Sequence, residues 1–237
     1  MLNIIPDDRK GKGIEIASGT GALLELITPA YPGITWQPTE YVPEERADPQ
    51  EQWSKHGKIG LREVTDELRN IDYHGSEVFK NCDPAVGLDL MKPWPAAIMD
   101  NRGAYEVIVC TNTLHITPIE CSTNLFRGAG EVLSPGGGVL VLYGPFKVGG
   151  KFIGEDGGEG NERFDEKLRN TNAGWGLRDV GDLEKIAGEE GLELRDQRNM
   201  PANNLLLPGV PEQSFHNLRN GRLRLPTAQH KLETSTV

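Results

Sequence analysis

Residues 13–21 read GIEIASGTG, and this segment says most about the fold. The apolar run 13–17, interrupted only by Glu15, predicts a buried strand, and Gly19 and Gly21 predict a tight turn free of Cβ atoms. A helix is expected from Ala22 and should end before Pro29. A strand, a glycine-rich turn and a helix in this order are typical of α/β folds that bind nucleosides.

Outward from this segment, strand-like and helix-like runs alternate, which predicts a doubly wound, mostly parallel α/β sheet. The further strands are expected at Ile34–Gln37, Ala85–Leu90, Tyr105–Cys110, Val139–Tyr143, Leu192–Arg198 and Asn203–Leu207. Helices are expected at Ser122–Leu133 and Val180–Glu190, with Asp179 as the N-cap of the second.

We expect one domain over residues 1–207, with a charged insertion at 43–81 that could hold a helix over Leu61–Asn70. The glycine-rich segment 144–175 is expected to form a lid loop. Residues 208–237 are polar and lack periodicity, so a loose C-terminal tail is expected.

Charge and composition argue against several function classes. A net charge of −10 without a basic stripe disfavours nucleic acid and anionic membranes as partners. The three cysteines lack CxxC spacing, no apolar run approaches a membrane span, and no carboxylate cluster or HxH pair suggests a metal. These features lead us to expect a cytoplasmic protein that holds no metal.

Acidic residues at the ends of predicted strands suggest a nucleoside site. Glu15 precedes the glycine turn, Glu40 follows the second strand and suits a pair of ribose hydroxyls, and Asp89 could accept the adenine amino group. The alternative, purely structural readings are a structural turn for the glycines, a solvated surface residue for Glu40, and a helix-capping or turn-forming role for Asp89. A dinucleotide fingerprint needs a third glycine where Leu24 stands, so a pyrophosphate cradle is incomplete.

Two later segments suggest an acceptor site. Asn112 and His115 follow the fourth strand and could orient or deprotonate a substrate, although a core histidine satisfied by the backbone is as plausible. Tyr143 and Phe146 follow the fifth strand as an aromatic lip, or simply as packing residues.

Several strings in order resemble the methyltransferase-like 26 family of the class I S-adenosylmethionine-dependent methyltransferases. They are IEIASGTG, ITWQPTE, LDL-x-x-PWP, VIVCTNTLHITP, LSPGGGVLVLYGPF, WGLRDVGDLEKIAGEEGLEL and MPANNLLL, from Gly13 to about Leu207.

The resemblance implies a seven-stranded sheet that ends in an antiparallel hairpin, with S-adenosylmethionine as cofactor. The implied cofactor contacts are Glu15, Ala17, Gly19, Gly21, Glu40, Asp89, Leu90 and Asn112. The implied acceptor pocket holds His115 as base, Tyr143 or Asn203 to orient the acceptor, and Phe146, Trp175 and Asn204 around it.

The favoured function is therefore methylation of a small molecule on oxygen, nitrogen or sulfur. A second hypothesis is a non-catalytic regulatory or scaffold protein that binds the same cofactor. A nicotinamide dehydrogenase is a weaker third, because Leu24 would intrude where helix and strand must pack closely.

Overall fold

A computed structural model describes residues 4–42, 68–69 and 71–212. The predicted helix Leu61–Asn70 lies almost wholly outside the described residues, as does most of the predicted insertion 43–81. The predicted tail lies outside them from residue 213 onward.

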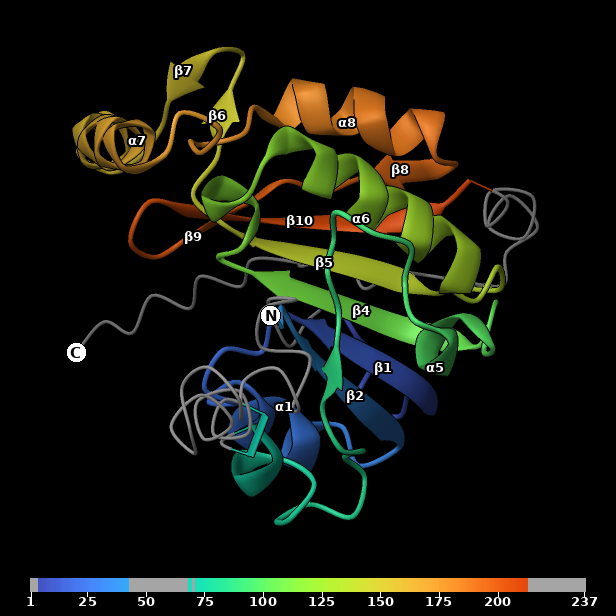
Figure 1. The fold of residues 1–237 in the computed structure, drawn as a ribbon. Helices are drawn as coiled ribbons and strands as arrows, with labels where there is room; N and C mark the ends of the chain where they lie inside the picture. The colour runs from blue at the N-terminus through green and yellow to red at the C-terminus, as the bar shows by residue number, and fades with distance from the viewer. Residues whose placement is uncertain (1–3, 43–67, 70, 213–237) are drawn as a thin grey trace, which may run out of the picture.

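The fold is built on one mixed sheet of eight strands (Figure 1). The strand order is β3-β2-β1-β4-β5-β10-β8, with β9 paired to β10. The strands are β1 (Gly11–Ile16), β2 (Ile34–Glu40), β3 (Val86–Gly87), β4 (Tyr105–Thr111), β5 (Val139–Gly144), β8 (Leu192–Leu194), β9 (Arg198–Met200) and β10 (Asn204–Pro211). The first five run parallel, and β10 is antiparallel to β5, β8 and β9. The predicted doubly wound α/β class is confirmed, with β9 as one strand more than the seven expected.

Helices cover both faces of the sheet (Figure 1). They are α1 (Leu24–Ala30), α5 (Ala96–Met99), the 3-10 turn η1 (Leu114–Ile116), α6 (Ile119–Val132), α7 (Glu159–Thr171) and α8 (Val180–Glu189). A small hairpin, β6 (Lys147–Val148) with β7 (Lys151–Phe152), precedes α7. No helix among the described residues is both long and apolar enough to cross a bilayer.

Two apolar cores result, one on each face. The α6–α8 core takes Ile14 and Ile16 of β1, while the α1 core takes Trp36 of β2 and Val107 of β4. Because side chains alternate along a strand, Glu15 lies between Ile14 and Ile16 but on the α1 side of the sheet.

Two prolines do not end the elements that they were expected to end. Strand β2 passes through Pro38 to Glu40, and the missing N–H is tolerated because Pro38 faces the outer edge of β2. On that edge the backbone bonds of Trp36 and Glu40 go to Asp83 and Leu88, so nothing pairs with Pro38 between them. Helix α1 contains Pro29 in its last turn and ends one residue later.

The prediction of a lid loop over residues 144–175 is wrong, because this segment contains β6, β7 and the 13-residue helix α7. Few apolar residues mark this helix, because two of the three buried residues of α7, Asn161 and Asp165, are polar. Asn161 donates to the carbonyl oxygens of Ile153 and Asn203, at 2.9 Å each. The helix is thus held by polar contacts in place of an apolar stripe.

The C-terminal end of the sheet is also longer than expected. Strand β10 continues to Pro211, past the predicted end at Leu207, and its register with β5 runs from Leu205 to Gly209. The predicted strand Leu192–Arg198 is split into β8 and β9.

Candidate functional site

The glycine-rich turn after β1 presents bare backbone at the carboxyl edge of the sheet. Ala17, Gly19 and Gly21 have φ of 55°, 60° and 80°, all left-handed. A Cβ added to Gly19 would meet nothing within 4 Å, whereas one added to Gly21 would lie 3.1 Å from the Cα of Ile71. Gly19 therefore borders open space, and Gly21 is covered by the segment that contains Ile71.

Glu40 lies at the same edge and reaches the same turn. Its Oε2 accepts a hydrogen bond from the backbone N–H of Gly19 at 2.6 Å, and its Oε1 accepts from Tyr41 N–H at 2.9 Å. The ends of β1 and β2 are joined by a further bond from Ser18 N–H to the carbonyl of Thr39. Gly19 and Glu40, predicted to serve one nucleoside from two strands, therefore lie side by side.

Glu15 is the buried acid of this site. It is 2% exposed, and its Oε2 accepts no hydrogen bond from the described residues. Burial raises the pKa of Glu15 to about 7; the nearby Ser18 hydroxyl opposes this effect, and the negative charge of Glu40 adds to it.

Asp89 and Leu90 follow β3, next to Glu40. The N–H of Leu88 donates to the carbonyl of Glu40 at 2.8 Å, which fixes this segment against the end of β2. The Oδ1 of Asp89 accepts from Met91 N–H at 2.8 Å in a local turn. Leu90 is buried, and its carbonyl accepts from the side chain of Asn124. Asp89 thus caps a turn, as the structural alternative predicted. Its Oδ2 lies 3.9 Å from Lys92 Nζ.

Asn112 and His115 lie at the ends of β4 and β5. Asn112 has a φ of 52° and donates its N–H to the carbonyl of Tyr143 at 2.8 Å. A Cβ added to Gly144 would lie 3.4 Å from Asn112 Oδ1 and 3.7 Å from His115 Nδ1, so both side chains converge on the end of β5. His115 is 7% exposed and packs edge-on against Phe164 of α7 at 5.4 Å.

The imidazole of His115 is neutral at pH 7. Burial, together with the positive charge of Arg178, lowers the pKa of His115 to about 4. A base with so low a pKa is weak, so the predicted role of His115 in removing a proton finds little support in this environment.

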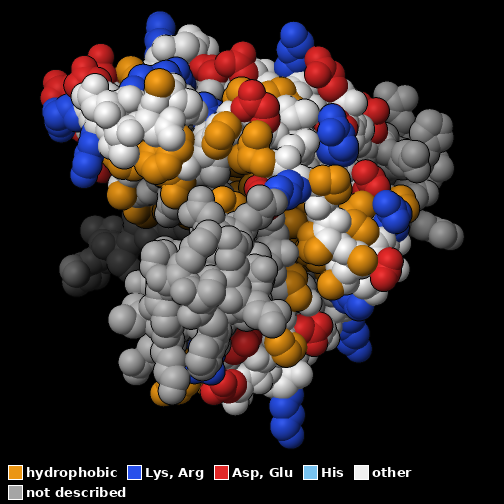
Figure 2. Space-filling view, viewed as in Figure 1, with side chains coloured by type: hydrophobic (Ala, Val, Ile, Leu, Met, Phe, Trp, Pro, Cys, Tyr) orange, Lys and Arg blue, Asp and Glu red, His pale blue; other side chains and the backbone are white. Residues whose placement is uncertain are grey.

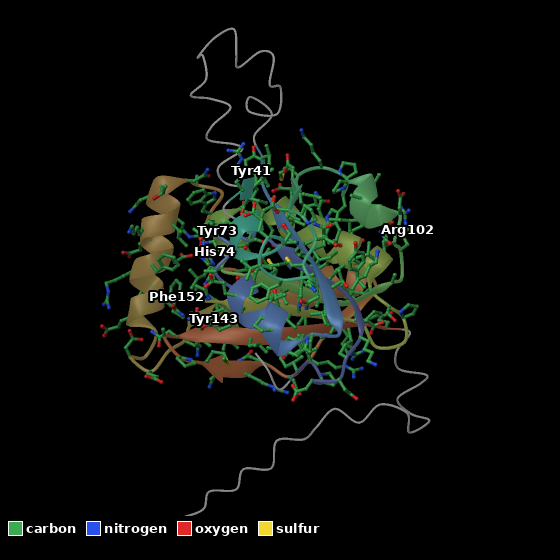
Figure 3. The ribbon with its side chains drawn as sticks, turned by 90° about the horizontal axis from the view of Figure 1, so that it is seen from below. Tyr41, Tyr73, His74, Arg102, Tyr143 and Phe152 are labelled. Carbon is green, nitrogen blue, oxygen red and sulfur yellow. The ribbon has the colours of Figure 1, made fainter. Side chains whose placement is uncertain are left out.

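The predicted aromatic lip does not form. Phe146 is 3% exposed and belongs to the α6–α8 core. Tyr143, which is labelled in Figure 3, packs against the α1 core on the other face of the sheet. Tyr143 points to the α1 side like Val139 and Val141 of β5, whereas Phe146 lies two residues beyond the end of that strand.

The side chain of Asn203 joins two segments by hydrogen bonds. Its Oδ1 accepts from Glu155 N–H at 2.9 Å, and its Nδ2 donates to Asp156 at 3.1 Å. Asn203 therefore holds the linker before α7 against the turn between β9 and β10. The side chain of Asn204 donates to backbone carbonyls of its own turn.

A cavity of about 510 Å³ lies beside Asn203. It is lined by Val148, Ile153, Gly154, Glu155, Gln197, Asn199, Met200, Asn203, Asn204 and Leu205. Leu205 pairs with Gly144, so the cavity starts next to the end of β5. Another cavity, of about 490 Å³ between α5 and α6, has none of the predicted site residues among its lining.

Residues 1–208 match the family described as "Protein of unknown function (DUF938)". The chain belongs to this family.

Solved structures similar to this DUF938 chain include methyltransferases. CalO1, a methyltransferase in calicheamicin biosynthesis with S-adenosylhomocysteine bound, is 15% identical with a TM-score of 0.61, over 89% of this chain and 52% of its own. An O-methyltransferase family protein from Burkholderia thailandensis is 16% identical with a TM-score of 0.61, over 89% and 54%. The O-methyltransferase NcsB1 from neocarzinostatin biosynthesis, bound to S-adenosylhomocysteine and 1,4-dihydroxy-2-naphthoic acid, is 18% identical with a TM-score of 0.57, over 89% and 52%. The chain spans about half the length of these proteins, and at these identities the likeness establishes the shared fold.

One important side chain of this DUF938 chain was missed in the sequence. The guanidinium of Arg178 donates to the carbonyl oxygens of Leu114, Thr117 and Gly174, which joins the η1 turn to the segment after α7. In the same place Gly176 N–H donates to the carbonyl of His115, beside the half-buried Trp175. No motif marks an arginine whose partners are backbone carbonyls, so the sequence offered no signal for it.

Proposed function

We propose that the protein is an S-adenosylmethionine-dependent methyltransferase that acts on a small molecule, in the manner of the methyltransferase-like 26 family that its sequence resembles. The observation that carries this proposal is the 2.6 Å contact between Gly19 N–H and Glu40, with open space over Gly19. The methyltransferase fold of CalO1 and NcsB1, each solved with S-adenosylhomocysteine, supports it.

Four groups of the chain fit the proposed cofactor. The carboxylate of Glu40 has lone pairs left for ribose hydroxyls after its two backbone bonds. Asp89 Oδ2 can accept from an adenine amino group, and the left-handed backbone at Ala17 and Gly19 lets a ligand approach closely. When bound, S-adenosylmethionine would supply a methyl group on a positively charged sulfur.

The acceptor is proposed to enter through the cavity beside Asn203. The cavity has apolar walls from Val148, Ile153 and Leu205 and amide groups from Gln197 and Asn199, a combination that suits a small molecule. Residues here would hold an oxygen, nitrogen or sulfur nucleophile in line with the methyl group and exclude water. The half-buried Trp175 is proposed to close this side, with Asn204 near the entrance.

A specific observation favours the non-catalytic alternative. Of the three residues proposed to act on the acceptor, Tyr143 packs toward the α1 core, the amide of Asn203 is engaged by the backbone and Asp156, and His115 is a weak base. A methyltransferase with such a site would act on an acceptor that keeps its proton or loses it to solvent. The same site is also compatible with a protein that binds the cofactor without catalysis.

The test has two stages. Isothermal titration with S-adenosylmethionine and S-adenosylhomocysteine is expected to show binding of both, and no binding at high micromolar concentration would end the proposal. Methyl transfer is then assayed over a panel of phenols, amines, thiols and carboxylic acids. Tight cofactor binding with no product over the panel would favour the non-catalytic protein. A parallel titration with reduced nicotinamide cofactor is expected to show none, because buried Leu24 occupies the position of the third fingerprint glycine.

A further inference from the structure

Two carboxyl groups lie near enough to interact electrostatically at the proposed cofactor site, and they differ in environment. Glu40 is half-buried, and its carboxylate accepts two backbone N–H bonds. Glu15 is 2% exposed, and its Oε2 accepts no hydrogen bond from the described residues. A buried carboxylate next to a second negative charge is costly unless a cation pairs with it.

No described group of this chain supplies such a cation. The titratable groups that interact electrostatically with Glu15 are Glu40 from β2, Cys82 from the segment before β3 and, on the opposite face of the sheet, Cys110 from β4. Burial raises the pKa of both thiols to about 12, so each stays neutral at pH 7. The other polar neighbour is the hydroxyl of Ser18. The site thus holds one acid, Glu15, without a counter-charge, and this acid lies four residues before Gly19 in the open glycine turn.

We propose that Glu15 selects a cationic ligand, since it carries a proton in the ligand-free protein and releases that proton to solvent when the positively charged part of S-adenosylmethionine binds. This inference rests on the proposed function and adds the property that selects the ligand. The positive centre restores the balance of charge that Glu15 and Glu40 cannot reach alone. An uncharged nucleoside such as adenosine would fill the same turn and leave the proton in place.

The pKa of Glu15, raised by burial to about 7, sets the size of the effect. If the bound cation lowers that pKa by about two units, proton linkage predicts release of about 0.8 proton per ligand at pH 6 and about 0.5 at pH 7. The same linkage predicts a dissociation constant that falls roughly fivefold from pH 6 to pH 7. At pH 6 the amino group of the ligand stays protonated and does not contribute.

The experiment is isothermal titration of the wild-type protein at pH 6 in two buffers that differ in enthalpy of ionisation, phosphate and imidazole. A difference in observed heat is expected for S-adenosylmethionine and none for adenosine. The same difference with S-adenosylhomocysteine would assign the contact to the ligand ammonium, and its loss there would assign it to the sulfonium; both results support the proposal. The proposal would be overturned if S-adenosylmethionine bound without releasing a proton. It would also be overturned if the binding of adenosine released as much proton as the binding of S-adenosylmethionine.

Two controls keep the result interpretable. The variant Glu15→Gln is expected to bind without proton release, while Glu159→Gln, on the exposed side of α7, should behave as wild type. If Glu15→Gln does not fold, the side-chain carboxyl resonance of Glu15 is titrated by carbon-13 NMR in the wild type. A midpoint near pH 7 that drops on addition of S-adenosylmethionine supports the proposal, and an unchanged midpoint refutes it. Absence of any cofactor binding would refute the proposed function itself, which separates the two failures.

Discussion

The buried acid also predicts how stability depends on pH, without any ligand. The pKa of Glu15 is raised from 4.5 to about 7, so the folded state keeps a proton that the unfolded state has lost between these values. Stability must then fall as the pH rises through that window, and the loss is complete above about pH 7. At 1.36 kcal/mol per pH unit, the part of the loss that falls between pH 5 and pH 8 is about 2.5 kcal/mol.

Replacement of Glu15 by Gln removes the titrating group and keeps its shape. Between pH 5 and pH 8 the wild type should lose about 2.5 kcal/mol of unfolding free energy that Glu15→Gln keeps. The difference between variant and wild type should therefore shift by this amount in favour of the variant, or by roughly 5–10 °C in melting temperature. Urea unfolding at both pH values measures this, with the exposed Glu159→Gln as a control that should follow wild type. Parallel pH profiles for wild type and Glu15→Gln, within about 0.5 kcal/mol, would refute the account of a buried, protonated Glu15.

Three further predictions concern the edge of the sheet. Gly19→Val should weaken S-adenosylmethionine binding by at least about tenfold in a titration while unfolding changes by about 1–2 kcal/mol, because a left-handed residue gains a side chain in open space. Arg178→Met should destabilise the protein by about 2–3 kcal/mol in urea unfolding, because three carbonyls lose their donor, and should raise the pKa of His115 in an NMR titration, because a positive charge leaves. Asn203→Ala should cost about 1–2 kcal/mol and speed amide exchange at Glu155, whereas an effect on acceptor turnover with unchanged exchange would show a direct role for Asn203.

The parts of the fold that follow from apolar pattern could be predicted. The strand Tyr105–Thr111 is almost continuously apolar, and Asp179 caps α8 through Gly181 N–H, as expected from a capping residue before an amphipathic run. Helix α7 was not predicted in this way, since two of its three buried residues, Asn161 and Asp165, are polar and the helix as a whole is strongly polar. Such a helix exists because distant backbone groups satisfy its buried polar side chains, and one sequence read locally does not reveal them.

The same division explains the candidate site. Glu15, Gly19 and Glu40 were predictable because each is placed by a strand end, and parallel strands bring their carboxyl ends to one edge. The acceptor side was predicted less well, because Tyr143 of β5 packs against the α1 core whereas Phe146, beyond the end of β5, enters the α6–α8 core. Strand topology determines the first group, whereas contacts between segments far apart in sequence determine the second.

The acceptor side is therefore held by one polar network, and that network suggests how binding there is organised. Arg178 joins η1 to the segment after α7, and Asp165 of α7 accepts from Leu177 N–H at 2.6 Å. Asn203 ties the linker before α7 to the turn between β9 and β10. These contacts are hydrogen bonds to backbone groups, so they fix the positions of the segments around the cavity while burying little apolar surface. The cavity walls can therefore have a specific shape without a large apolar core beneath them. A substitution in this network should therefore change acceptor discrimination before it changes cofactor affinity, which depends on Gly19 and Glu40 at the other side of β4.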